Sequence, residues 1–193
     1  MHRFAATLLF AAALLSQAAG AAVGTQRDDP ELRAALHAAI QDTGSFSDRF
    51  DAEVWLMDMS SRLRHKVRDA QERIQLLKMI HHEAARVNVP PELVLAVIEV
   101  ESNFDRWAVS SAGAQGLMQV MPFWLEELGR PDDSLQQPHI NLRLGCTILR
   151  HYLDRERGDL RRALARYNGS PLINMNSYPQ RVLDALRMRW YRQ

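Results

Sequence analysis

Residues 97–122 read VIEVESNFDRWAVSSAGAQGLMQVMP, and this stretch decides how the sequence folds. It begins in an almost uninterrupted apolar segment, from which one carboxylate, Glu101, emerges before a run rich in glycine, serine and glutamine. Burial of an acid is costly, and acids in such surroundings gather at functional sites. We therefore expect a helix that ends at a candidate catalytic acid, followed by a segment that forms a wall of its cleft.

The helix that carries this acid should begin at Pro91, because proline is tolerated at the first helical position and Glu92 complements the helix dipole. Residues 93–98 are all apolar and leave little solvent face, which predicts a helix buried within the fold. Glu101 shares a stripe with apolar residues three and four positions earlier. These neighbours and the negative helix end should raise the pKa of Glu101, as a general acid near neutral pH requires.

Two other carboxylates compete for this role. Glu99 lies two residues before Glu101 and points to a different side of the helix, so we expect a structural pairing role for it, although spacing alone does not exclude it. Asp105 follows Glu101 by four residues and could share its face. We interpret Asp105 as a helix-end or turn residue, because Asp-Arg-Trp comes where the helix should stop.

The rest of the chain carries helical periodicity with no convincing strand alternation, which predicts an all-α fold. Apart from the helix that begins at Pro91, the expected helices cover residues 31–41, 51–63, 69–87, 123–128, 140–157, 159–167 and 179–191.

The length of 193 residues favours one domain behind a leader. Residues 1–22 have the charged start, apolar run and small-residue exit of a signal peptide, and the run is too short to span a bilayer comfortably. We expect cleavage rather than a retained membrane anchor. Residues 23–79 then form an N-terminal helical extension, and residues 80–193 form the main body.

Charge and cysteine usage exclude several classes of function. The 24 Lys and Arg residues against 23 Asp and Glu residues give a net charge of +1, which does not indicate nucleic-acid binding. Cys146 is the single cysteine and sits among Leu and Ile, so we expect a buried, inert thiol rather than an intermolecular disulfide or a nucleophile. The sequence His81-His82-Glu83 lacks the HExxH spacing, and we expect neither a metal site nor a cofactor.

Four elements in fixed order, ES, SxxGAxGLMQxMP, NLRLG and YN, resemble the soluble-type lytic transglycosylases, the Transglycosylase SLT domain of the lysozyme-like superfamily. The resemblance spans about residues 80–190. It implies a lysozyme-like catalytic domain over residues 80–193. It also implies a lyase that cleaves the MurNAc-GlcNAc β-1,4 bond of peptidoglycan without water and leaves 1,6-anhydroMurNAc ends. In this family one Glu serves first as acid and then as base.

The resemblance implies a role for each matching residue. Glu101 is the catalytic residue. The implied substrate-binding residues are Ser102, Ser110, Met118, Gln119, Tyr167, Asn168 and Tyr178. The chain departs from the family pattern at Gly169, which follows Asn168 without the usual intervening residue. Trp107 and Trp124 could stack on sugar faces, but for Trp124 we expect a place in the core.

The expected substrate is therefore the glycan strands of peptidoglycan, and the expected location is the periplasm. A hydrolytic muramidase is the nearest alternative. It would add a water molecule across the cleaved bond. A non-catalytic peptidoglycan-binding assembly factor is an alternative of another class, although it would have no reason to keep a buried acid. The N-terminal helices could also dock an envelope protein partner.

Overall fold

The computed structural model describes residues 49–128, 130–169 and 178–191. In these ranges the chain is helical, and its extended pairings are two isolated β-bridges, from Gln115 to Val109 and to Val120. The all-α prediction is confirmed for this part of the chain. None of its helices has the length and apolar character needed to cross a membrane. The predicted signal peptide and the predicted helix over residues 31–41 lie outside the described residues.

Seven α-helices and one π-helical turn are described. They are α3 (Arg49–Leu63), α4 (Ala70–Arg86), α5 (Pro91–Glu101), α6 (Phe123–Glu127), α7 (Pro138–Arg155), α8 (Leu160–Tyr167), α9 (Tyr178–Ala185) and the π-helical turn Leu186–Trp190.

Local sequence signals explain where several of these helices begin. Asp69 caps α4 by accepting a hydrogen bond from the Glu72 amide at 2.6 Å, and Asp159 caps α8 in the same way. Pro91 occupies the first turn of α5, where its missing N–H costs nothing. α7 begins at Pro138, two residues earlier than predicted, for the same reason.

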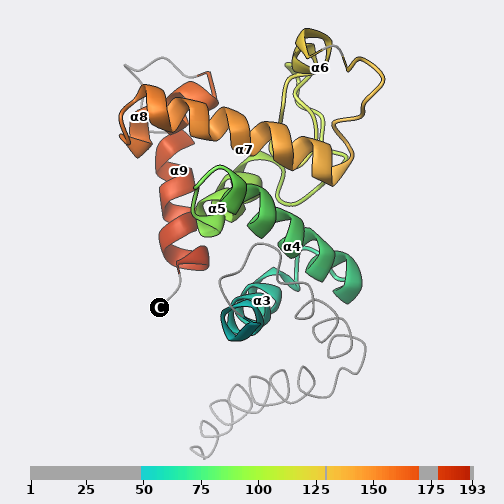
Figure 1. Ribbon diagram of the computed structural model, residues 1–193, viewed down its shortest axis with the longest axis vertical. Coiled ribbons are helices and arrows are strands. Elements are labelled where there is room, and N and C mark those ends of the chain that lie inside the picture. The colour runs from blue at the N-terminus through green and yellow to red at the C-terminus, as the bar shows by residue number, and fades with distance from the viewer. Residues whose placement is uncertain (1–48, 129, 170–177, 192–193) are drawn as a thin grey trace, which may run out of the picture.

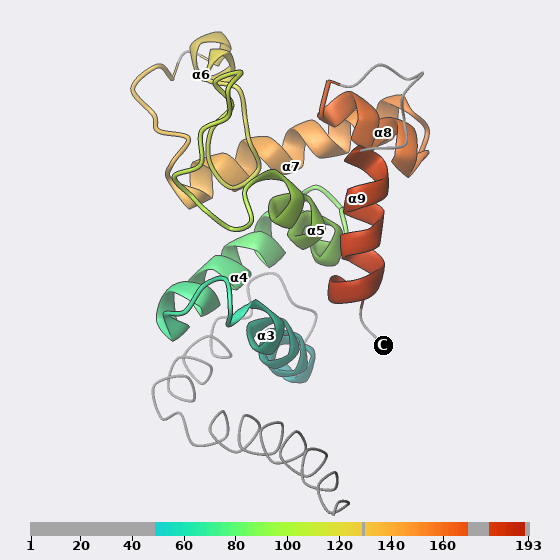
Figure 2. The same cartoon turned by 180° about the vertical axis from the view of Figure 1, so that it is seen from behind.

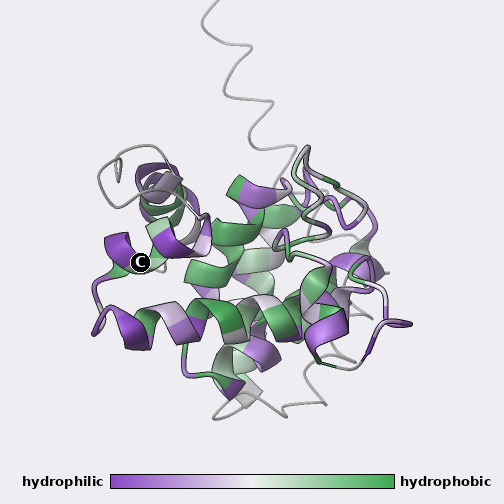
Figure 3. Ribbon diagram, turned by 90° about the horizontal axis from the view of Figure 1, so that it is seen from above, coloured by the Kyte–Doolittle hydropathy of each residue, from purple (hydrophilic) through white to green (hydrophobic). Residues whose placement is uncertain are grey.

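The apolar helix α5 lies in the middle of the molecule, with α4 and α9 packed against it (Figure 1). The reverse view shows the same order, with α7 crossing the molecule between α8 and the region of α6 (Figure 2). Apolar ribbon gathers at the centre and polar ribbon at the periphery (Figure 3). Residues 93–98 of α5 are all buried, as predicted. Because these residues are packed on every side, α5 is held in place, and its last residue, Glu101, is held with it.

The last predicted helix, residues 179–191, is instead two elements. α9 ends at Ala185 and the π-helical turn continues to Trp190. Trp190 is buried, packs on Phe104 with ring centroids 5.6 Å apart, and donates its indole N–H to Glu99. The π-helical turn accompanies this placement of the indole. The apolar spacing of the sequence did not predict this turn.

Candidate active site

Glu101 is the last residue of α5, and its carboxylate is mostly buried. Burial raises the pKa of Glu101 above its ordinary value of 4.5. The Tyr178 hydroxyl donates a hydrogen bond of 2.6 Å to Glu101 Oε1, and this bond, with the charge of Arg181, partly opposes the rise. The predicted direction of the shift is confirmed. An acid of this kind can hold its proton at a higher pH than an exposed glutamate and then release it.

Glu99, two residues earlier, has a different environment. Its carboxylate forms ion pairs with Lys66 at 3.0 Å and Arg189 at 2.8 Å, and it accepts the Trp190 indole N–H at 2.7 Å. Burial alone would raise the pKa of Glu99. The three hydrogen bonds and the Lys66 charge outweigh this effect, so the pKa of Glu99 is lowered. The structural pairing role predicted for Glu99 is confirmed.

Asp105 lies in the turn that follows α5. Its side chain is exposed and accepts a hydrogen bond from the Trp107 amide at 2.9 Å. This is the local bond of an aspartate that closes a turn. The interpretation of Asp105 as a turn residue is confirmed, and it does not line the cavity that contains Glu101.

Asn141 of α7 is a buried side chain that helps to hold the segment between Ala108 and Val120 to the body. Its Oδ1 accepts the Met118 amide at 2.8 Å, and its Nδ2 donates to the carbonyls of Gln115 at 2.8 Å and Leu135 at 2.9 Å. Gly116 allows this close approach, because a Cβ there would lie 2.3 Å from the Leu135 carbonyl oxygen. Asn141 is a positioning residue that the sequence reasoning missed.

Met118 is fully buried. Gly145 of α7 makes room for it, since a Cβ at that glycine would lie 2.5 Å from Met118 Sδ. The backbone carbonyl of Met118 accepts a hydrogen bond of 2.8 Å from the Tyr167 hydroxyl. Met118 thus connects the loop to α7 and α8 and packs in the core, and it does not line the cavity.

Gln119 has a positive φ of 49°, unlike most residues with a side chain. Its Nε2 donates to the carbonyls of Gly116 at 3.0 Å and Ala108 at 3.2 Å. These bonds hold the left-handed backbone and leave the side-chain carbonyl oxygen for another partner. Ser110 stabilises the same loop, because its hydroxyl accepts the Ala114 amide at 3.0 Å.

A cavity of about 430 Å³ opens beside Glu101. Five of the predicted site residues line it, and they come from distant parts of the chain. These are Glu101, Ser110, Gln119, Tyr167 and Asn168. Glu101 is the only carboxylate among the described lining residues, and Arg166, which pairs with Glu156, is the only cation.

The three other predicted residues lie behind this lining. Tyr178 is buried and reaches the cavity through its bond to Glu101. Met118 is the core residue described above. Ser102 Oγ donates to the Leu117 carbonyl at 2.8 Å, with the Ile98 carbonyl at 3.2 Å. The hydroxyl of Ser102 therefore ties the end of α5 to the loop.

The expectation that Trp124 belongs to the core is wrong. Trp124 is 36% exposed and its neighbour Phe123 is 47% exposed, and both line the cavity. In α6 the inward position belongs to Leu125, which is 7% exposed. A five-residue helix buries only one narrow face, so the adjacent aromatic residues face outward. Trp107 is also exposed, at 58%, but does not line this cavity.

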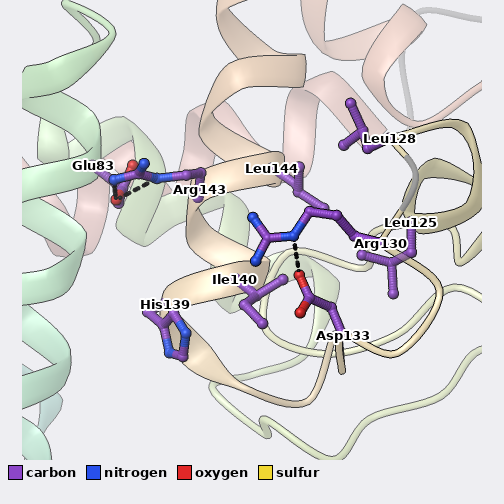
Figure 4. A pocket seen from close by; sticks show the side chains of 9 residues that line it. All are labelled: Glu83, Leu125, Leu128, Arg130, Asp133, His139, Ile140, Arg143 and Leu144. Atoms are coloured by element: carbon purple, nitrogen blue, oxygen red, sulfur yellow. Dashed lines mark hydrogen bonds and ion pairs between the residues drawn. The ribbon is translucent and has the colours of Figure 1, made fainter.

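A second cavity, of about 290 Å³, lies between the Leu125–Leu128 side of α6 and the first half of α7 (Figure 4). Its buried carboxylate, Glu83, pairs with Arg143 at 2.9 Å and with Arg86 at 2.6 Å. Burial raises the pKa of Glu83, but the hydrogen bonds and charges of both arginines outweigh burial and lower it. A lowered pKa makes Glu83 a poor proton donor, so Glu83 is not the candidate acid.

Neither a metal site nor a reactive thiol is found in the described part of the chain. No group of three or more His, Cys, Asp or Glu residues lies close enough there to hold a metal ion. Cys146 is buried, and burial followed by the Glu83 charge raises its pKa to about 12. The prediction of a buried, inert thiol is confirmed.

Comparison with known proteins gives a family match over the region that builds the site. The Transglycosylase SLT domain family matches residues 78–181. The chain is 32% identical over 120 residues to a transglycosylase of Enterobacteria phage PRD1, over 60% of this chain and 44% of the phage protein. It is 48% identical over 48 residues to the membrane-bound lytic murein transglycosylase C of Actinobacillus pleuropneumoniae, over 25% of this chain and 13% of that protein.

A similar protein of Haemophilus ducreyi, also a membrane-bound lytic murein transglycosylase C, is 37% identical over 91 residues, over 40% of this chain and 25% of that protein. The chain thus spans less than half the length of these relatives. The family match covers more than half of this chain. It includes α5, the loop between Ala108 and Val120 that Asn141 binds, and the residues that line the cavity. On this evidence the chain belongs to the Transglycosylase SLT domain family, and its fold is of the lysozyme-like, all-α type.

Proposed function

We propose that this chain is a peptidoglycan lytic transglycosylase that cleaves the MurNAc-GlcNAc β-1,4 bond and leaves 1,6-anhydroMurNAc ends. The observation that carries this proposal is the isolation of Glu101. It is the only described carboxylate lining the cavity, its pKa is raised, and a tyrosine hydroxyl orients it.

In the first step Glu101 acts as a general acid. Its protonated carboxyl donates a proton to the glycosidic oxygen while the bond between that oxygen and the anomeric carbon breaks. The acetamido group of the substrate supports the positive charge that develops at this carbon, in place of a second carboxylate. The Tyr178 hydroxyl, 2.6 Å from Oε1, stabilises the carboxylate that forms.

In the second step the same group acts as a base. The carboxylate of Glu101 accepts the proton of the MurNAc C6 hydroxyl, whose oxygen bonds to the anomeric carbon and closes the 1,6-anhydro ring. The proton that left Glu101 in the first step is thereby replaced, and no water is consumed. Gln119, Tyr167 and Asn168 line the same cavity and supply amide and hydroxyl groups for the sugar.

Most glycosidases that consume water use a second carboxylate across the bond. The exposed Asp105 closes a turn, and residues 170–177, outside the described ranges, contain neither Asp nor Glu. These observations favour the single-acid reaction over hydrolysis. We further propose a periplasmic location, which rests on the leader-like residues 1–22. We also propose that the N-terminal extension of residues 23–79 binds an envelope protein.

Mass spectrometry of the products released from purified peptidoglycan tests the proposal. The matched control for Glu101→Gln is Glu99→Gln, which changes a paired carboxylate on the same helix. We expect anhydro ends from the wild type and from Glu99→Gln, and none from Glu101→Gln. Reducing ends from the wild type would make the protein a muramidase. Binding without products from the wild type would favour the assembly-factor role.

A further inference from the structure

Phe123 and Trp124 form an exposed aromatic pair on α6. Their ring centroids lie 4.9 Å apart, with 35° between the ring planes. Both residues have more than a third of their surface exposed, and both line the cavity that contains Glu101. Adjacent apolar side chains left open on a protein surface commonly mark a binding site.

The backbone holds this pair firmly, although α6 has only five residues. The amide of Leu125 donates to the Pro122 carbonyl at 2.9 Å, and the amide of Leu128 donates to the Trp124 carbonyl at 3.1 Å. The Arg130 amide closes the end of the helix on the Leu125 carbonyl at 2.8 Å. Leu125 is buried and holds α6 against the body, so the two aromatic side chains remain exposed on the other side of the helix.

α6 stands between the two cavities. Phe123 and Trp124 belong to the cavity of Glu101, whereas Leu125 and Leu128 line the cavity of Glu83 (Figure 4). The two faces of one short helix thus have different chemistry. The aromatic side lines the cavity of the candidate acid, and the aliphatic side lines the other cavity together with residues of α7.

The other lining of the Glu101 cavity suits a neutral, polyhydroxylated ligand. Tyr152, Tyr167, Asn168 and Gln119 line the cavity with hydroxyl and amide groups. The Tyr167 hydroxyl oxygen and the Gln119 side-chain carbonyl oxygen can still accept hydrogen bonds, although both side chains already donate to backbone carbonyls. Arg166, the single cation among the described lining residues, is already paired with Glu156. A sugar ring has an apolar C–H face that packs on aromatic rings and a hydroxyl edge that needs such polar partners.

We propose that Phe123 and Trp124 form a stacking platform for a sugar ring of the glycan strand, next to the bond that Glu101 would cut. The platform is a binding and positioning element that holds the strand before and during the reaction, and it takes no part in proton transfer. This inference rests on the proposed function, because it assumes that the ligand of the cavity is a saccharide.

Binding of N-acetylglucosamine tetramers and hexamers by the full chain tests the platform. Titration calorimetry on Glu101→Gln, which preserves the cavity without turnover, gives the reference affinity. In that background we expect Trp124→Ala and Phe123→Ala each to weaken binding about tenfold, the usual scale for one aromatic contact. Trp107→Ala is the matched control, since it removes an exposed tryptophan that does not line the cavity, and it should leave the affinity unchanged.

Two further readouts separate stacking from a structural role. Trp124→Phe should recover most of the affinity, because it keeps an aromatic face. With Glu101 intact, Trp124→Ala should raise KM for soluble glycan strands while kcat changes less than about twofold. This is the result expected for a contact that is equally strong in the bound ground state and in the transition state. Melting curves monitor folding, and Phe123→Ala carries the test if Trp124→Ala does not fold.

Unchanged affinity in both alanine variants, or an equal loss in Trp107→Ala, would overturn the platform. Failure of the proposed function gives a different result. In that case the wild type makes no anhydro products, whereas loss of the platform leaves the product chemistry intact and changes only the affinity.

Discussion

The cavities on the two sides of α6 each contain a buried glutamate, and the two glutamates behave in opposite ways. Glu83 is held by Arg86 and Arg143, and its pKa is lowered. Glu101 forms no ion pair within the described residues; a tyrosine hydroxyl is its partner, and its pKa is raised. Burial is common to both sites. The counter-charge therefore decides which carboxylate can act as an acid.

The largest expected effect is on activity. Glu101→Gln should lower the rate of glycan release about 10²- to 10⁴-fold, the usual contribution of a positioned acid and base. Glu83→Gln should leave the rate per folded molecule near that of the wild type. Turbidity loss of a peptidoglycan suspension, normalised to folded protein, gives both rates. Equal losses in the two variants would remove the distinction between the cavities.

The same two variants should have opposite effects on stability. Glu83→Gln leaves two partly exposed arginines without their carboxylate, which should cost about 1–3 kcal/mol at neutral pH. Because the folded pKa of Glu83 is lowered, its contribution is present above the ordinary value of 4.5 and is lost as the pH falls through the folded value. The difference between this variant and the wild type should therefore shrink in acid.

Glu101 has the opposite sign. Its folded pKa is raised, so the folded state loses stability as the pH rises from 4.5 through the folded value. Glu101→Gln removes this loss and should melt higher than the wild type at neutral pH, with no difference at about pH 4. Thermal melts across this range test the signs. A Glu101→Gln variant less stable at neutral pH would contradict the raised pKa.

Tyr178→Phe should have a smaller effect on activity, of about tenfold, because it removes one hydrogen bond to the charged form of Glu101. The pKa of Glu101 should rise further, and because the first step needs the protonated carboxyl, the alkaline limb of the pH–rate profile should move to higher pH. A profile that keeps its shape while its height falls would assign Tyr178 to packing alone.

The smallest effect should come from Arg143→Gln. The arginine side chain is 55% exposed, and Arg86 still pairs with Glu83 after the change. We expect a loss of at most about 1 kcal/mol in denaturant unfolding and no change in rate. A larger loss would mean that Arg143 alone keeps Glu83 ionised.

Apolar spacing and caps predicted most of this fold. The segment 69–87 appears as α4 with its Asp69 cap, and Pro91 begins α5 as expected. The predicted last helix is present, but its residues 186–190 form a π-helical turn with the buried Trp190, and the prediction did not include that turn. Helical periodicity contains no information about such a turn, since tertiary contacts decide it.

The candidate site was predicted unevenly for a physical reason. The sequence marks Glu101 because an acid at the end of an apolar helix is unusual. Asn141 begins the NLRLG element, but its role was not predicted, because an asparagine early in a helix looks like a surface residue until the three backbone groups it binds are known. Trp124 was misplaced because the inward face of a short helix cannot be chosen without its neighbours.

The most direct test of the contrast between the cavities is the titration of the glutamate carboxyl groups by NMR with ¹³C-labelled glutamate, for the wild type and Glu101→Gln. We predict a resonance that titrates above 4.5 in the wild type and is missing from the variant, while Glu83 and Glu99 titrate below that value. If the resonance that titrates above 4.5 persists in Glu101→Gln, or if every glutamate titrates at or below 4.5, Glu101 is not the general acid of this protein.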